Sequence, residues 1–318
     1  MKKILLIIIF TVVSYIVFAE EQAKNFNITP FLNYEYFHFN EQKIHSPGEG
    51  IMFNKGNLYP SFSEERNSLM IAGMYKQYFI MEAAEGYNLV FHNIGIFAER
   101  KIKQHLFFGV LSSSASEPFV GGLHTFMAGI GYGYELVRKE NFSFTLGGGF
   151  GISDFGIELS NGKTLPVLPI PIMRFNLELS IIDFYLELIQ DITIGFTLMP
   201  DKKLRFKGDL SVNPFDIQNI RDLFFDIALW YRFFSNESKM GDFMGIGIGV
   251  NNNGFGFTLS EKEKRYDVDY FSVYGIFDMS FIKINGGYLM NGREIFDTEN
   301  IKKTGNGFFI NIFLGWQF

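Results

Sequence analysis

Charged side chains recur at every second position of residues 203–209. Lys203, Arg205, Lys207 and Asp209 alternate there with uncharged residues. Because successive side chains of a β-strand point to opposite faces, all four would lie on one face. The corresponding faces of other segments carry Arg174, Glu178, Glu187, Asp222, Asp226, Arg232, Asp278 and Lys283. Ions are costly to bury in a dry core. The pattern therefore predicts a wet face whose mixed charges could select solutes electrostatically.

Residues capable of covalent or metal chemistry are few and scattered. The five histidines, His38, His45, His92, His105 and His124, show no metal-binding spacing and no HExxH motif. The stretch from Glu158 to Gly162 resembles the His-x-Ser-Asn-Gly element of outer-membrane phospholipases. Glu158 stands where that element has its histidine, so Ser160 lacks a base of suitable pKa. We expect no enzymatic activity, no cofactor and no metal.

The faces opposite the charges are apolar. In residues 192–198 the second face reads Ile192, Ile194, Phe196 and Leu198. Similar alternation occurs in residues 126–136, 142–152, 173–181, 222–233, 244–250 and 282–288. A period of two predicts β-strands, and the contrast between their faces predicts a wall between water and an apolar medium.

Glycines occupy the polar face of three of these segments, at positions 129, 131, 133, 147, 149, 151, 245, 247 and 249. Two interpretations remain open. Glycine could relieve crowding where a barrel wall bends sharply. Alternatively, a smooth inner wall could admit a folded-in plug or an extended apolar ligand.

The composition favours a β protein rich in glycine and aromatic residues. The chain of 318 residues contains 39 Phe, 15 Tyr and 33 Gly, but no Cys. Hydrophobic residues make up 47% of it, yet the chain after the N-terminal stretch has no run of 18 apolar residues that could form a membrane helix. A closed barrel is the remaining way to pair every backbone group in lipid.

The first nineteen residues have the pattern of a secretory signal. Lys2 and Lys3 precede an apolar run from Ile4 to Phe18, and Val17-Phe18-Ala19 offers a small-residue cleavage site. We expect cleavage after Ala19 and export. Loss of the two lysines leaves 26 basic against 34 acidic residues, a formal charge of −8. Such a chain is not expected to bind nucleic acid.

Fifteen strand-like segments can be counted, but bacterial barrels have an even number. Residues 183–199 read as one long strand, and the asparagines at 251–253 read as a tight turn between two strands. The sequence then predicts an antiparallel up-and-down transmembrane barrel of about 14 strands at 68–318, with 12 to 16 possible. Residues 20–67 are set apart as a possible plug or first strand.

The chain ends in an alternating apolar pattern formed by Ile310, Ile312, Leu314, Trp316 and Phe318. With the signal peptide and the alternating strands, this pattern resembles Gram-negative-type outer-membrane β-barrel proteins, without identifying a subfamily. The resemblance implies location in the outer membrane, contact with its lipid, and recognition of the terminal pattern by the barrel assembly machinery.

For function, the sequence favours a passive, porin-like channel for small solutes. One alternative is a channel for hydrophobic compounds or fatty acids with an N-terminal plug, and another is a structural or adhesive surface barrel without transport. The inward charges also leave two possibilities open, because they could line a water-filled passage or close it by ion pairing.

Overall fold

The computed structural model describes residues 26–55, 67–81, 89–120, 125–158, 164–189, 192–212, 223–234, 244–259, 264–279, 281–296 and 300–315. Several predictions fall outside these residues: the signal peptide at 1–19, His124, Ser160, Asp222, Trp316 and Phe318. Among the described residues, no helix has the length and hydropathy needed to cross a membrane.

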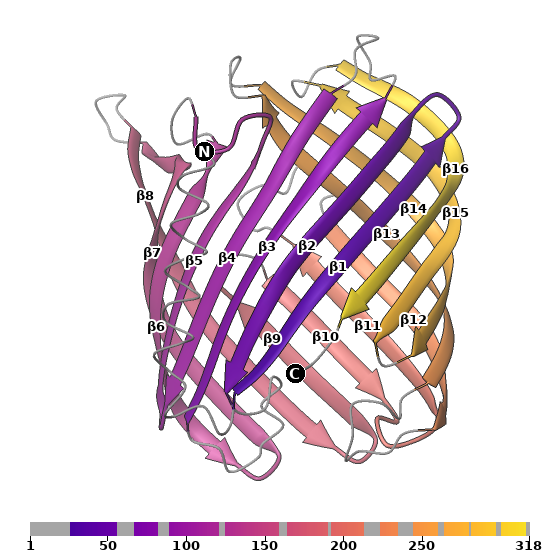
Figure 1. Ribbon diagram of the computed structural model, residues 1–318. Coiled ribbons are helices and arrows are strands. Elements are labelled where there is room, and N and C mark those ends of the chain that lie inside the picture. Colours follow the sequence, from indigo (N-terminus) through magenta and orange to yellow (C-terminus); the bar gives the residue numbers. More distant parts are fainter. Residues whose placement is uncertain are drawn as a thin grey trace.

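The described chain forms sixteen strands in a single closed antiparallel barrel (Figure 1). They are β1 (Phe26–Phe39), β2 (Lys43–Lys55), β3 (Asn67–Met81), β4 (Leu89–Ile102), β5 (His105–Ala115), β6 (Met127–Lys139), β7 (Phe142–Glu158), β8 (Thr164–Leu179), β9 (Ile182–Leu188), β10 (Ile192–Leu198), β11 (Leu204–Val212), β12 (Leu223–Phe234), β13 (Met244–Leu259), β14 (Lys264–Met279), β15 (Ile282–Phe296) and β16 (Asn300–Gly315). β1 pairs with β16 from Phe31↔Gly315 to Phe39↔Gly307, which closes the ring.

The predicted number of about 14 strands is corrected to sixteen, and β2 is one reason. Residues 43–55 pair with β1 on one side and with β3 on the other, so they stand in the barrel wall. The sequence did not predict β2 because it contains Pro47, Gly48 and Gly50, and proline and glycine are disfavoured inside strands. The register with β3 runs from Lys43 to His45 and resumes at Gly48, so Pro47 sits where the ladder is interrupted.

The predicted single strand at 183–199 is two short strands, β9 and β10. Leu188 and Ile192 face each other directly across the hairpin. Because these two positions differ by four, the even-numbered residues stay on one face through the turn. The alternation therefore continues unbroken in the sequence although the chain reverses direction.

The predicted turn at 251–253 lies instead inside β13. Asn252 is the last residue of β13 that pairs with β12, opposite Phe225. Its side-chain Oδ1 accepts a hydrogen bond from Phe225 N at 2.7 Å, and its Nδ2 donates to Leu223 O at 2.7 Å. The Asn252 side-chain amide thus forms hydrogen bonds with backbone groups of β12 at the point where β13 stops pairing with β12. β13 can therefore separate from β12 without a turn in the chain.

Beyond Asn252, β13 crosses the barrel and meets β5. Thr258 pairs in parallel with Ala115, and Ser116 N donates to Thr258 O at 2.9 Å. β5 and β13 are eight positions apart in the ring of sixteen, so they belong to opposite walls. Their contact closes a smaller ring of nine strands, β13 to β16 and β1 to β5, at the rim that carries the β1–β2 turn, here called the upper rim (Figure 1).

The small ring is filled by an aromatic core. Its buried residues are Phe37, Phe39, Ile44, Tyr78, Ile80, Phe91, Phe257, Tyr266, Val268, Tyr270, Leu289 and Phe296. Barrels of about eight strands are just wide enough for side chains to fill them, so a nine-strand ring can be dry although a sixteen-strand ring would not be. Within this core Gln42 Nε2 donates to Glu294 Oε1 at 3.0 Å, and Tyr266 donates to the same oxygen at 2.5 Å.

The outer surface is apolar, as the alternation predicts. Large side chains exposed on it include Ile130 at 70%, Phe150 at 65% and Ile248 at 59%. An apolar exterior on a closed antiparallel barrel with an even number of strands is the architecture that spans outer membranes. The chain is therefore an outer-membrane-type β-barrel, which confirms the predicted resemblance and location.

The contact between opposite walls can be tested by cross-linking, because the natural chain has no cysteine. The double variant Ala115→Cys/Thr258→Cys should form a disulfide under oxidation, since directly paired strands bring Cα atoms within the roughly 7 Å that a disulfide requires. Electrophoresis of the oxidised and reduced protein would detect the bond.

The matched control is Leu111→Cys/Thr258→Cys. Leu111 lies on the same face of β5, four residues or roughly 13 Å along the strand from Ala115, and should not cross-link. Equal cross-linking in the two variants, or none in either, would contradict the nine-strand ring.

Candidate solute site in the barrel lumen

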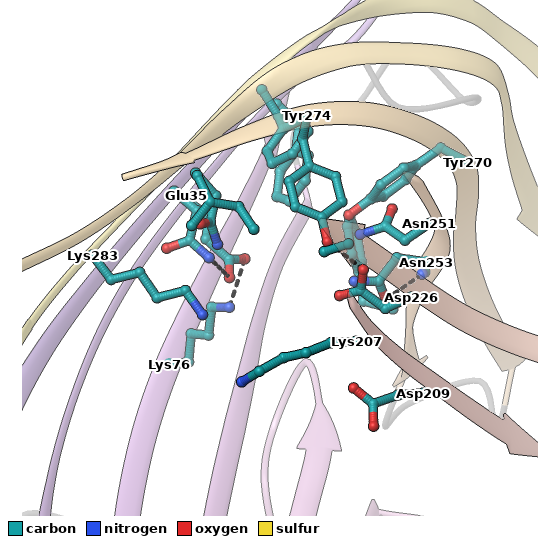
Figure 2. Close-up of a pocket in the computed structure, with 18 of the residues that line it drawn as sticks. Glu35, Lys76, Lys207, Asp209, Asp226, Asn251, Asn253, Tyr270, Tyr274 and Lys283 are labelled. Atoms are coloured by element: carbon teal, nitrogen blue, oxygen red, sulfur yellow. Dashed lines mark hydrogen bonds and ion pairs between the residues drawn. The ribbon is translucent and has the colours of Figure 1, made fainter. Parts of the chain in front are cut away.

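A cavity of about 380 Å³ lies in the lumen directly below the aromatic core. Phe37, Tyr78 and Tyr270 belong to both, so they form the roof of the cavity. The charged residues of its wall are Glu35, Lys76, Lys207, Asp209, Asp226 and Lys283 (Figure 2). A charged chamber thus begins where the dry core ends.

The acidic part of the wall consists of two carboxylates on neighbouring strands. Asp209 of β11 and Asp226 of β12 are direct cross-strand partners. Like charges in this arrangement repel each other, and each aspartate has a neutral donor. Tyr185 donates to Asp209 Oδ1 at 2.8 Å, and Tyr274 donates to Asp226 Oδ1. The tyrosines hold the carboxylates in place without cancelling their charge.

The basic part of the wall consists of two lysines around one indole ring. Lys207 of β11 and Lys283 of β15 each place Nζ 5.6 Å from the ring centroid of Trp230 on β12. Cation–π contacts of this length stabilise an ammonium without neutralising it. Within the described chain, neither Nζ has a carboxylate oxygen within the 4.0 Å of an ion pair. Figure 2 shows the two side chains extending toward each other from opposite sides of the cavity.

Five other charged side chains of the lumen form ion pairs. Lys76 Nζ lies 2.6 Å from Glu35 Oε2 at the edge of the same cavity. Arg174 of β8 contacts Glu187 of β9 at 2.7 Å and Glu99 of β4 at 2.8 Å. The prediction from sequence left open whether inward charges line a passage or close it, and the described residues include charges within ion pairs as well as charges outside them.

The contact between Arg174 and Glu99 depends on a sharp bend of the wall, because β5, β6 and β7 lie between their strands. The bend is made by glycines. A Cβ atom at Gly147 would lie 2.0 Å from Tyr132 O, and one at Gly149 would lie 2.3 Å from Ile130 O. At Gly131 the added atom would meet the ring of Phe108 at 2.4 Å. These glycines therefore accommodate a bent wall and a neighbouring side chain, which supports the first of the two predicted roles.

The predicted lumen-lining residues divide into three groups. Lys207, Asp209, Asp226 and Lys283 line the cavity, with Asp278 of β14 directly opposite Lys283, and Arg174 and Glu187 form the ion pair on the other side of the lumen. The remaining described members lie near the lower rim: Glu178 N bonds to Asn141 O, Arg205 Nε to Lys202 O, and Arg232 N to Lys203 O.

Four features of the site escaped the prediction. Tyr274 and Asn251 line the cavity, but both faces of β14 carry large apolar side chains around Tyr274, and Asn251 was assigned to a turn. The partners Glu35 and Lys76 come from the first three strands, of which the first two were set apart from the barrel. The alternation of polar and apolar residues along β1 and β3 could have identified Glu35 and Lys76 as inward residues.

The terminal strand has the predicted orientation in its described part. Phe309 and Asn311 line the cavity. The opposite face of the strand carries Phe308 and Ile310, which are exposed, and Ile312 and Leu314, which are partly exposed. Recognition of this pattern by the assembly machinery remains a prediction.

No protein-family model and no curated protein matches the sequence. Similar solved structures include OccK8 (OprE) of Pseudomonas aeruginosa, with 8% identity, coverage of 92% of this chain and 98% of that chain, and a TM-score of 0.34. OccAB3 of Acinetobacter baumannii has 8% identity, coverage of 92% of this chain and 99% of that chain, and a TM-score of 0.33. CdiB of Acinetobacter baumannii has 10% identity, coverage of 91% of this chain and 60% of that chain, and a TM-score of 0.38. Superpositions this loose carry nothing about a substrate or an activity.

The contact that holds Asp226 can be tested at Gly249 of β13. A Cβ atom there would lie 2.5 Å from the Tyr274 ring, so Gly249→Ala should displace the ring and its hydrogen bond to Asp226. We expect a loss of about 1–3 kcal/mol in the free energy of unfolding, the usual cost of overpacking.

Urea titration of the barrel folded into lipid vesicles would measure this loss. Gly275→Ala is the matched control, because an added Cβ on β14 meets nothing closer than 3.9 Å. Equal stability of the two variants would contradict the described position of Tyr274.

Proposed function

We propose that this barrel is a passive channel that lets small polar solutes cross the outer membrane. The observation that carries the proposal is the lumen cavity with two ammonium groups and two carboxylates that form no ion pairs with described residues. Charges that served only to brace a wall would be expected to pair, as those of Arg174 and Lys76 do. Charges kept in a wet lumen act on passing solutes.

The fold limits the size of the solutes. At the upper rim, the contact between β5 and β13 divides the lumen, and the aromatic core fills the nine-strand part. A solute therefore has to pass on the side of β6 to β12, beside Arg174 and its partners. We infer a narrow passage for small solutes in place of a wide general pore.

A polar solute is favoured over an apolar one. The alternative of a hydrophobic-compound channel drew on residues 20–67 as a plug, but β1 and β2 occupy residues 26–55 of the wall. The cavity also presents charged and amide side chains from seven of its surrounding strands. An acyl chain would have to displace water from these groups without replacing their hydrogen bonds.

Conductance of the refolded protein in planar lipid bilayers tests the proposal. The wild type should give discrete current steps in potassium chloride. The double variant Lys207→Glu/Lys283→Glu should shift the preference toward cations. A unit charge about 4 Å from a passing ion contributes about 1 kcal/mol even at the dielectric constant of water, so the cation-to-anion permeability ratio should rise roughly fivefold or more.

Arg205→Glu provides the matched control, because Arg205 shares the strand of Lys207 but lies by the turn at Lys202. It should change the cation-to-anion permeability ratio less than Lys207→Glu/Lys283→Glu does. Absence of current in the wild type would refute the channel, and would favour the structural barrel.

A further inference from the structure

Resting on the proposed channel, we infer that the lumen cavity binds small zwitterions, that is, solutes with an ammonium group and a carboxylate such as α-amino acids. The two lysines would receive the carboxylate and the two aspartates would receive the ammonium group. The inference goes beyond a general preference for polar solutes because it assigns the two ends of the solute to named residues.

The cavity contains opposite charges that are held apart. Lys207 and Asp209 lie on the same face of β11, two residues apart. Their close contacts are with neutral rings, and no ion pair joins them: Lys207 contacts Trp230, and Asp209 accepts a hydrogen bond from Tyr185. In the same way, Lys283 contacts Trp230 and Asp226 accepts a hydrogen bond from Tyr274. The cavity therefore has a positive part and a negative part already in place before a solute arrives.

The positive part is suited to one carboxylate. Lys207 and Lys283 come from strands four positions apart in the ring and both approach the Trp230 ring. A carboxylate has two oxygens and accepts several hydrogen bonds, so it can receive one from each ammonium. The indole supplies a flat wall beside it.

The negative part is suited to one ammonium group. Asp209 and Asp226 are directly opposite each other, and their repulsion is not relieved by a described cation within ion-pair distance. An ammonium group has three donors and can bond to both carboxylates. Its binding would remove the repulsion between them.

The two parts lie next to each other along one wall of the cavity. The Cα atoms of residues two apart on a strand lie roughly 6.8 Å from each other, so Lys207 and Asp209 can both face a small solute whose two charged groups stand on the same or neighbouring carbon atoms. A simple anion would meet the carboxylates, and a simple cation would meet the lysines. The aromatic roof of Phe37, Tyr78 and Tyr270 offers apolar surface to a short side chain.

The experiment compares two isomers in proteoliposome swelling. L-alanine is a zwitterion, whereas lactamide has the same atoms without formal charges. Wild-type protein should admit L-alanine faster than lactamide, by roughly threefold or more given the ~1 kcal/mol of each charge contact. Lys207→Met/Lys283→Met and, separately, Asp209→Asn/Asp226→Asn should each bring the ratio to about one, because each double variant removes one end of the site.

Lys203→Met is the matched control. Lys203 lies in the exposed turn before β11 and does not line the cavity, so this variant should keep the wild-type ratio. Single-channel current in potassium chloride is recorded for every variant, which separates a folded channel with altered preference from a protein that failed to fold.

The outcomes distinguish the inference from the proposal beneath it. Normal current with equal entry of the two isomers would overturn the zwitterion site and leave the channel standing. A preference for L-alanine that survives in the conducting Lys207→Met/Lys283→Met variant would also overturn it. Absence of current and of entry above protein-free liposomes would overturn the channel itself.

Discussion

The meeting of two opposite walls governs the rest of this barrel. A ring of sixteen strands is wide enough to leave an aqueous channel, whereas a ring of about eight is filled by its own side chains. The pairing of Ala115 with Thr258 joins β5 to β13. It reduces the upper part of the sixteen-strand ring to a ring of nine strands, which is narrow enough to be filled by side chains. Aromatic residues that would otherwise face water are then buried against one another, as in the parallel stacking of Phe91 and Phe257 with centroids 4.5 Å apart.

That junction requires β13 to leave β12 without exposing backbone groups to an apolar surrounding. Unpaired backbone groups are expensive wherever water is excluded. Asn252 meets the requirement by bonding to Leu223 O and Phe225 N through its own amide. The Asn252 side chain thus allows β13 to separate from β12. The place of this separation sets the boundary between the dry aromatic core and the charged cavity.

The sequence predicted the faces of the strands well and their connections less well. Period-two alternation reports which side of a strand meets lipid, so Lys207, Asp209 and Asp226 could be identified as inward. The alternation does not show a hairpin turn when the paired residues on its two sides differ by an even number, as Leu188 and Ile192 do. Pairing across the lumen was equally hidden, because the Arg174–Glu99 contact depends on a bend made by glycines of other strands.

The retention of charges that form no ion pair within the described chain is the strongest physical reason for proposing a functional lumen. A wall selected only for stability would gain by pairing Lys207 with a neighbouring aspartate, or by replacing both with uncharged residues. Instead, Trp230, Tyr185 and Tyr274 hold the ions in position while leaving their charges available. Local arrangements that forgo stability are expected where a protein acts on something else. In a barrel whose upper lumen is partly filled by an aromatic core, the proposed channel makes that other component a solute small enough to pass beside the core.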